Sequence, residues 1–163
     1  MSDQQAQIFS LDLVLSLVGF TIILIFLISS WNIYSARLQE NMVGEELQLT
    51  AMQMTDILTK SEGQPMQWEN NPSNVSLIGL ALRPGSLDED KVNAFVSMDY
   101  NQVKKLFNIK RFEYRFMLFG INGTIQNVSG MIPSNSSSQV TSVSRYILLH
   151  NETRQLVFTL WKD

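Results

Sequence analysis

Five asparagines stand two residues before a serine or threonine, the N-x-S/T spacing that accepts an N-linked glycan. They are Asn74, Asn122, Asn127, Asn135 and Asn151. Twelve asparagines in a chain where about one residue in six is Ser or Thr predict roughly two such sites by chance. All five follow residue 70. Polar loops rich in Asn and Ser explain part of this excess, but we favour the interpretation that the C-terminal part of the chain lies outside the cell.

The residue types needed for catalysis or metal binding are scarce. Cysteine is absent and His150 is the only histidine, which excludes thiol chemistry, histidine triads and multi-histidine metal sites. The acidic run 88–90 lacks the spacing and glycine of a calcium loop and suits the first turn of a helix. We therefore assign no catalytic residue, no metal site and no cofactor, and expect no enzymatic activity.

A small basic cluster is the one feature that could suggest nucleic acid. It comprises Lys104, Lys105, Lys110 and Arg111. A net charge of −3 and a pI near 5.1 argue against a nucleic-acid partner. We expect this cluster to be a solvated face or a contact to a partner protein.

The segment most able to position the chain is an apolar run near its beginning. No charged residue occurs between Asp12 and Arg37, and residues 13–36 would form a helix about 36 Å long. A bilayer core needs about 20 apolar residues, and Trp31 and Tyr34 would lie at its headgroup layer. The sequence therefore predicts a single transmembrane helix over residues 13–36.

A cleaved secretory signal is the main alternative for this apolar run. Such signals begin with basic residues and end at a small-residue cleavage site. Residues 1–6 contain no Lys or Arg, and no A-x-A-like site follows Ile28. We expect the segment to remain as an anchor, with the N-terminus in the cytoplasm and the C-terminal domain outside.

The helix is expected to continue beyond the membrane, over residues 37–62. Gly63 and Pro65 then supply a stop. Apolar residues recur at spacings of mostly four, which predicts one apolar face that packs on the chain's own domain or on partner helices. That predicted face comprises Tyr34, Leu38, Met42, Leu47, Ala51, Met54 and Leu58.

Residues 64–163 are expected to form the extracytoplasmic domain. Alternating patterns predict strands over 112–119, 124–128, 139–149 and 154–161, and a short apolar strand over 77–82. Asn122-Gly123 is a strong hairpin sequence. Ser86 and Asp99 are expected to cap two short helices. The predicted fold is α+β, a long N-terminal helix packed on a four- or five-stranded antiparallel sheet with two short inserted helices.

This layout, with Gln-Ile-Phe-Ser-Leu-Asp before the apolar run, resembles the type IV pilin-like proteins of archaea, which carry class III signal peptides. The matching positions are Ala6, Gln7, Ser10 and Asp12. The resemblance implies a cytoplasmic leader over residues 1–12, cut by a prepilin-type peptidase near Ala6, Gln7 and Ile8. It also implies that Asp12 pairs with the N-terminus of a neighbouring subunit and sets assembly register. Alternatively, Asp12 rests in the headgroup layer, where a helix N-terminus favours its charge.

Three functions follow from these patterns. The first is a structural pilin-like or pseudopilin-like subunit of a surface filament or secretion-type apparatus, with membrane, peptidase and other subunits as partners. The second is a non-polymerising single-pass protein whose outer domain binds a ligand or partner protein. The third, a membrane-tethered enzyme, has no pair of reactive residues to support it.

Overall fold

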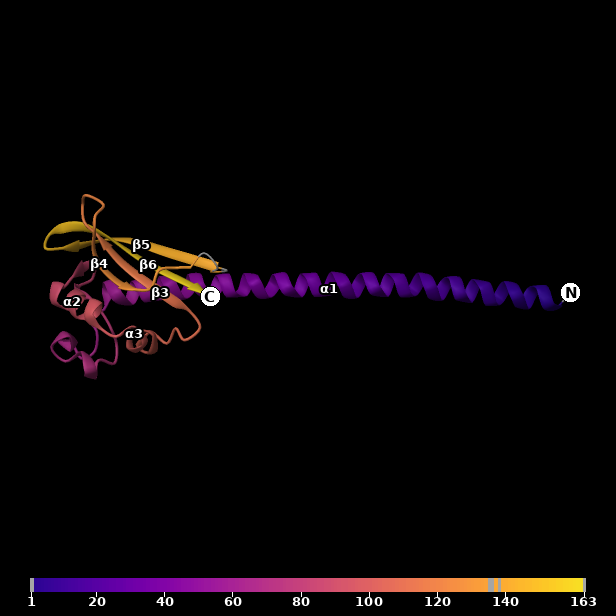
Figure 1. The fold of residues 1–163 in the computed structure, drawn as a ribbon, viewed down its shortest axis with the longest axis horizontal. Coiled ribbons are helices and arrows are strands. Elements are labelled where there is room, and N and C mark those ends of the chain that lie inside the picture. The colour runs from indigo at the N-terminus through magenta and orange to yellow at the C-terminus, as the bar shows by residue number, and fades with distance from the viewer. Residues whose placement is uncertain (1, 135–136, 138, 163) are drawn as a thin grey trace. The chain divides into compact units, whose positions relative to one another are not determined.

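The computed structural model describes residues 2–134, 137 and 139–162, and these divide into two compact units. One unit spans residues 1–43 and the other, here called the head, spans residues 44–163. In chain order the elements are α1 (Ser2–Lys60), two 3-10 turns (Trp68–Asn70 and Pro72–Asn74), β1 (Ala81–Arg83), β2 (Ser86–Leu87), α2 (Glu89–Ser97), α3 (Tyr100–Leu106), β3 (Glu113–Phe119), β4 (Ile125–Gly130), β5 (Gln139–Leu149) and β6 (Glu152–Lys162) (Figure 1).

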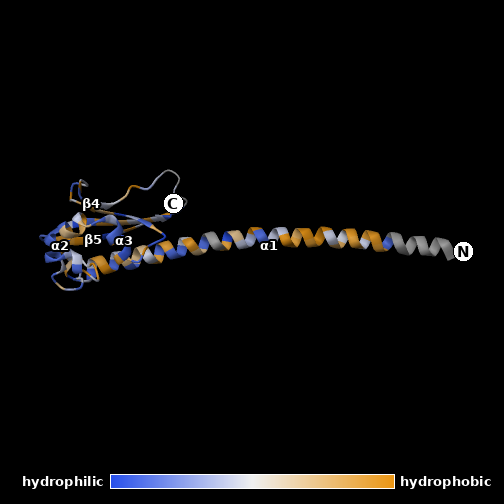
Figure 2. Cartoon of the chain, turned by 60° about the horizontal axis from the view of Figure 1, so that its bottom comes forward, coloured by the Kyte–Doolittle hydropathy of each residue, from blue (hydrophilic) through white to orange (hydrophobic). Residues whose placement is uncertain are grey.

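The helix α1 contains the predicted membrane segment. It begins at Ser2 and ends at Lys60, close to the predicted end at Glu62. Among the described residues it is the one helix long and apolar enough to cross a membrane. The run of hydrophobic residues is followed by a stretch that mixes polar and apolar positions (Figure 2).

The head contains one six-stranded sheet with the strand order β1-β2-β5-β6-β3-β4. The α+β class is confirmed, whereas the expected four or five strands, all antiparallel, are wrong in detail. The difference comes from Ser86, which was expected to cap a helix but forms β2 and pairs in parallel with Leu148 of β5. The helix cap is Asp88 instead, whose side chain accepts from the N–H groups of Asp90 and Lys91.

One face of the sheet carries the core. Alternate residues of β3 are buried and lie opposite buried residues of β6, in the pairs Tyr114–Leu160, Phe116–Phe158 and Leu118–Leu156. The ring of Phe95 in α2 meets Phe116 edge-on at 5.1 Å, and Phe107 after α3 meets Phe158 at 6.0 Å. The helices therefore cover a single face of the sheet (Figure 1).

The last turns of α1 supply part of this core. Leu47, Ala51 and Leu58 are fully buried. Thr55 and Thr59 are buried beside them. Each hydroxyl donates to the carbonyl one turn earlier, at 2.6 and 2.8 Å, so neither is buried without a hydrogen-bond partner. This part of the predicted apolar face therefore packs on the chain's own domain.

The other half of that predicted face behaves differently, and the expectation of one continuous face is wrong. Tyr34, Leu38 and Met42 are 59%, 44% and 67% exposed. The five-residue step from Met42 to Leu47 rotates the side chain by about 140°, because each residue of an α-helix turns about 100°. The pattern therefore consists of two apolar stripes on different sides of α1.

The end of α1 is capped by a later segment of the head. The backbone N–H groups of Leu80, Ala81 and Gly85 donate to the carbonyls of Leu58, Ser61 and Thr59, at 3.0, 3.0 and 3.1 Å. A helix end leaves such carbonyls without intrahelical partners. The predicted strand over residues 77–82 is therefore found only in part, because the observed strand β1 begins at Ala81.

Candidate functional site

The largest uncovered apolar surface of the described chain lies on α1. Every residue from Asp12 to Tyr34 is exposed. Between Leu13 and Ile28, thirteen large hydrophobic side chains are exposed, from 39% at Leu24 to 70% at Phe26. Burying each would gain about 1.5–3 kcal/mol, so covering the set is worth on the order of 20–40 kcal/mol. Contact with lipid or with other helices would therefore strongly stabilise this segment.

The three residues predicted as a processing site lie just before this surface. Ala6, Gln7 and Ile8 fall within the first turns of α1, which begins at Ser2. Asp12 is exposed at the boundary between these turns and the apolar run. Its carboxylate is therefore accessible to a cationic partner or to headgroups.

A smaller apolar surface lies on the part of α1 that belongs to the head. Leu49 and Met52 are 60% and 40% exposed, and they line a shallow hollow with Glu45 and Gln48. Leu49 is about 200° around the helix from buried Leu47. The apolar face predicted from the sequence does not include this pair. The signal in the sequence is a helical spacing of three, four and three residues along Met42, Glu45, Leu49 and Met52, which places these side chains on one side of the helix.

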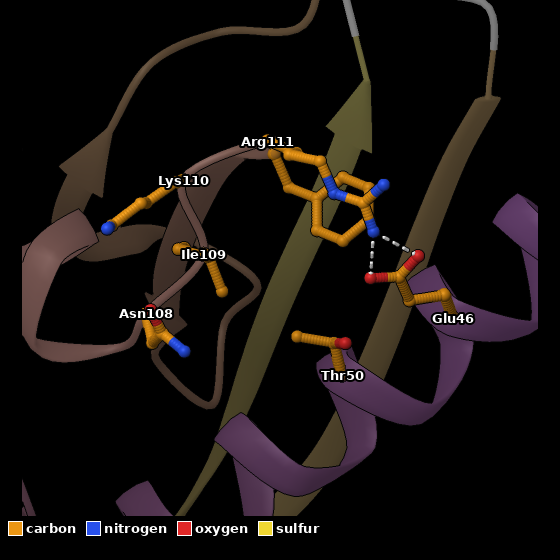
Figure 3. Close-up of a pocket in the computed structure, with 7 residues that line it drawn as sticks. Glu46, Thr50, Asn108, Ile109, Lys110 and Arg111 are labelled. Carbon is orange, nitrogen blue, oxygen red and sulfur yellow. Dashed lines mark hydrogen bonds and ion pairs between the residues drawn. The ribbon is translucent and has the colours of Figure 1, made fainter.

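A hollow between α1 and the loop after α3 holds an ion pair (Figure 3). It is lined by Glu46, Thr50 and residues 108–112. One nitrogen, Nη2 of Arg111, donates to both carboxylate oxygens of Glu46, at 2.6 Å to Oε2. The guanidinium also lies 5.7 Å from the centre of the Phe112 ring. This pair connects the loop to α1 but adds little to stability, because both side chains are more than 40% exposed, and the lining of the hollow includes no histidine.

A polar cluster joins α3 to the first residue of β3. Lys104 Nζ lies 2.7 Å from Oε1 of Glu113, and the hydroxyl of Tyr100 donates to Oε2 of the same carboxylate. Burial, reinforced by this hydrogen bond, raises the pKa of Tyr100 well above its usual value. The Tyr100 ring also stacks on Tyr114 at 5.0 Å. In this cluster a neutral phenol donates to a carboxylate that is already paired with a lysine. Such an arrangement stabilises the contact between α3 and β3 and provides no reactive group.

A second ionic group lies where α1 approaches β5. Asp56 contacts Lys60 at 2.7 Å and Arg145 at 3.5 Å. The hydrogen bond from Lys60 is the main reason that the pKa of Asp56 is lowered. All three side chains are more than 40% exposed, so the group adds little to stability.

The charged runs singled out in the sequence are mostly used within the head. Lys104 and Arg111 are paired with Glu113 and Glu46, which leaves Lys105 and Lys110 exposed. In the acidic run, Asp88 caps α2 and Glu89 lies 3.1 Å from Nε2 of His150. Within the described residues, no three His, Cys, Asp or Glu side chains gather as a metal site would require.

The glycosylation candidates differ in accessibility. Asn74, Asn122 and Asn151 are exposed, whereas Asn127 is half-buried in β4. Asn135 lies outside the described residues.

Comparisons with protein families, with curated proteins and with solved structures find no match to this chain.

Proposed function

We propose that this protein is a pilin-like structural subunit of a cell-surface filament or secretion-type apparatus. It is anchored in the cell membrane by residues 13–36, with its N-terminus in the cytoplasm and its head outside. Other copies or related subunits are its partners through α1. Nucleic acid is not an expected partner, and no enzymatic activity is proposed.

The observation that carries this proposal is the uncovered apolar surface of α1. Thirteen large exposed hydrophobic side chains satisfy the requirement for crossing a bilayer. Two further apolar side chains, Leu49 and Met52, are exposed on the part of α1 that belongs to the head, beyond the predicted transmembrane span. An isolated anchor has no need of apolar residues there, whereas helices that pack side by side do.

Asp12 supports the same proposal from the other end of the span. A carboxylate at the edge of a membrane segment is costly unless it is paired or kept in the interface. Cleavage near Ala6, Gln7 and Ile8 by a prepilin-type peptidase would create a new cationic N-terminus within a few residues of this carboxylate. A neighbouring subunit's N-terminus could then pair with Asp12 and set the axial register.

The competing proposal is a single-pass protein that does not polymerise and whose head binds a ligand or a partner protein. The hollows of the head support it, because two of them are lined by solvent-exposed ion pairs, Glu46–Arg111 in one and Asp56–Lys60 in the other. The two proposals differ in what happens to the N-terminus and to Leu49 and Met52.

The deciding experiment is the N-terminal sequence and intact mass of the protein purified from its native membranes. A chain that begins at Gln7 or Ile8 supports processing by a prepilin-type peptidase and the subunit proposal. A chain that still begins at Met1 or Ser2 contradicts processing and favours the non-polymerising anchor.

A further inference from the structure

The four described N-x-S/T sites offer their two reacting groups to solvent very differently. Glycan transfer needs the asparagine amide and the hydroxyl two residues later to be reachable together. Spacing alone treats all the sites as equal. Burial and hydrogen bonding in the folded head separate them.

Two sites lie on hairpin turns. Asn122 lies between β3 and β4, and both Asn122 and Thr124 are exposed. Asn151 lies in the two-residue turn between β5 and β6, with a φ of 64°, and Thr153 is exposed. Because Phe119 pairs with Gln155, both turns lie at the same end of the sheet (Figure 1).

A third site is closed by the sheet itself. Asn127 is half-buried opposite buried Leu118, and Ser129 is only 7% exposed opposite Phe116. The Ser129 hydroxyl lies 3.1 Å from the phenol oxygen of Tyr114 and shares a hydrogen bond with it. Reaching both groups would require β4 to leave β3.

The fourth site falls between these extremes. Asn74 and Ser76 are both exposed. The Ser76 hydroxyl, however, donates to the backbone carbonyl of Gln64 at 3.2 Å. Its hydroxyl must break this bond before it can assist transfer.

We propose that, among the four described sites, Asn122 and Asn151 are the glycan acceptors of the folded head, and that Asn127 is shielded from modification. The donor class is an oligosaccharide carried on a polyprenyl phosphate or pyrophosphate. The amide Nδ2 bonds to the anomeric carbon, the bond from that carbon to the phosphate oxygen breaks, and the lipid phosphate leaves. The amide proton passes to a base of the transferase. The inference rests on the proposed extracellular location of the head.

Two glycans on adjacent hairpins would give this end of the sheet a hydrated cover. Subunit contacts would then be confined to other surfaces of the head, including the part of α1 that carries Leu49 and Met52. The same sequence rule thus yields different roles at different sites, because the fold decides which hydroxyl is available.

The test is glycopeptide mapping of the protein purified from its native membranes, with the variants N122Q, N151Q and N127Q expressed in the same host. We expect occupancy at Asn122 and at Asn151 to exceed that at Asn127 at least tenfold. N122Q and N151Q should each lower the intact mass by one glycan, whereas N127Q should leave the glycan mass unchanged. A smaller ratio at either turn overturns the inference.

A peptide spanning residues 124–131 contains only the Asn127 site and provides the control for the physical cause. When this peptide is incubated with membranes of the same host, its Asn127 should be glycosylated, whereas Asn127 of the folded chain should not be. A peptide that stays bare would show that the fold is not what protects Asn127, and the explanation would fail. A bare Asn122 and Asn151 in a chain beginning at Gln7 or Ile8 would overturn this inference alone, not the proposed function.

Discussion

The ammonium group of Lys91 donates a hydrogen bond of 2.9 Å to the backbone carbonyl of Glu62, just beyond the end of α1. A second bond, at 3.4 Å, reaches the carbonyl of Ala81. Lys91 is only 4% exposed, and the two backbone carbonyls that accept its hydrogen bonds stabilise its ammonium group inside the head. A cation at a helix C-terminus is also favoured by the helix dipole. This contact joins α2 to the end of the long helix across 29 residues of sequence.

Replacing Lys91 should therefore destabilise the head. Lys91→Met retains a long unbranched side chain but removes the donor to the part-buried carbonyl of Glu62, at an expected loss of about 1–3 kcal/mol in unfolding free energy. Urea unfolding of the full chain in detergent measures the loss. Lys105→Met, which removes an exposed lysine from α3, is the control and should change stability by less than about 0.5 kcal/mol. Equal stability of the two variants would contradict the capping role.

Gly79 is expected to tolerate no side chain. A Cβ at this position would lie 2.3 Å from the carbonyl oxygen of Ser61 and 2.4 Å from the amide nitrogen of Gly63. Because both neighbours are backbone atoms, Gly79→Ala should destabilise the head by about 3 kcal/mol or more. The matched substitution Gly44→Ala meets only the Gln139 side chain, at 4.0 Å, and should stabilise α1 by up to about 1 kcal/mol. Thermal unfolding curves that shift in the same direction for both variants would refute this reasoning.

The Tyr100–Glu113 hydrogen bond predicts a stability loss in alkali. The pKa of Tyr100 is raised mainly by burial, so above pH 10 the folded state keeps a proton that the unfolded state loses. Stability is therefore full below pH 10 and falls as the pH rises, by up to about 1.4 kcal/mol per pH unit for this proton. Tyr100→Phe should make the decline measured by urea unfolding between pH 9 and 12 shallower. Tyr146→Phe removes an exposed hydroxyl and should retain the wild-type slope.

Exposed Leu49 and Met52 should matter for association and not for folding. Because the chain contains no cysteine, Leu49→Cys or Met52→Cys introduces a single thiol. If subunits pack through this part of α1, oxidation in native membranes should give disulfide-linked dimers at several times the level seen with Met66→Cys, an exposed control in the loop after α1. Equal crosslinking of all three variants would favour the non-polymerising anchor. Unfolding of each reduced variant should stay within about 0.5 kcal/mol of wild type.

Local patterns predicted the elements that depend on neighbouring residues. The alternation in β3 places Tyr114, Phe116 and Leu118 on the buried face, and Asp99 caps α3 as expected, its side chain accepting from the N–H of Gln102 at 3.0 Å. Strand β5 begins and ends at the predicted residues. These features follow from periodicity and capping, which require no knowledge of the rest of the chain.

Features that depend on distant partners could not be predicted in this way. The pairing of Ser86 with Leu148 links residues 62 apart in the sequence, and it turned an expected helix cap into a strand. Burial of Lys91 likewise depends on carbonyls at Glu62 and Ala81. In the candidate site, the apolar run was visible in the sequence. The separation of Leu49 and Met52 from the buried stripe required knowing which side of α1 meets the sheet.

The position of β6 sets the order in which the head can form. This strand, Glu152–Lys162, lies between β5 and β3 and pairs with both along its length. Until β6 is in place, β3 and β5 have no shared neighbour and the core face stays open. The sheet therefore closes late in the folding of the head, because its two halves can join only through β6.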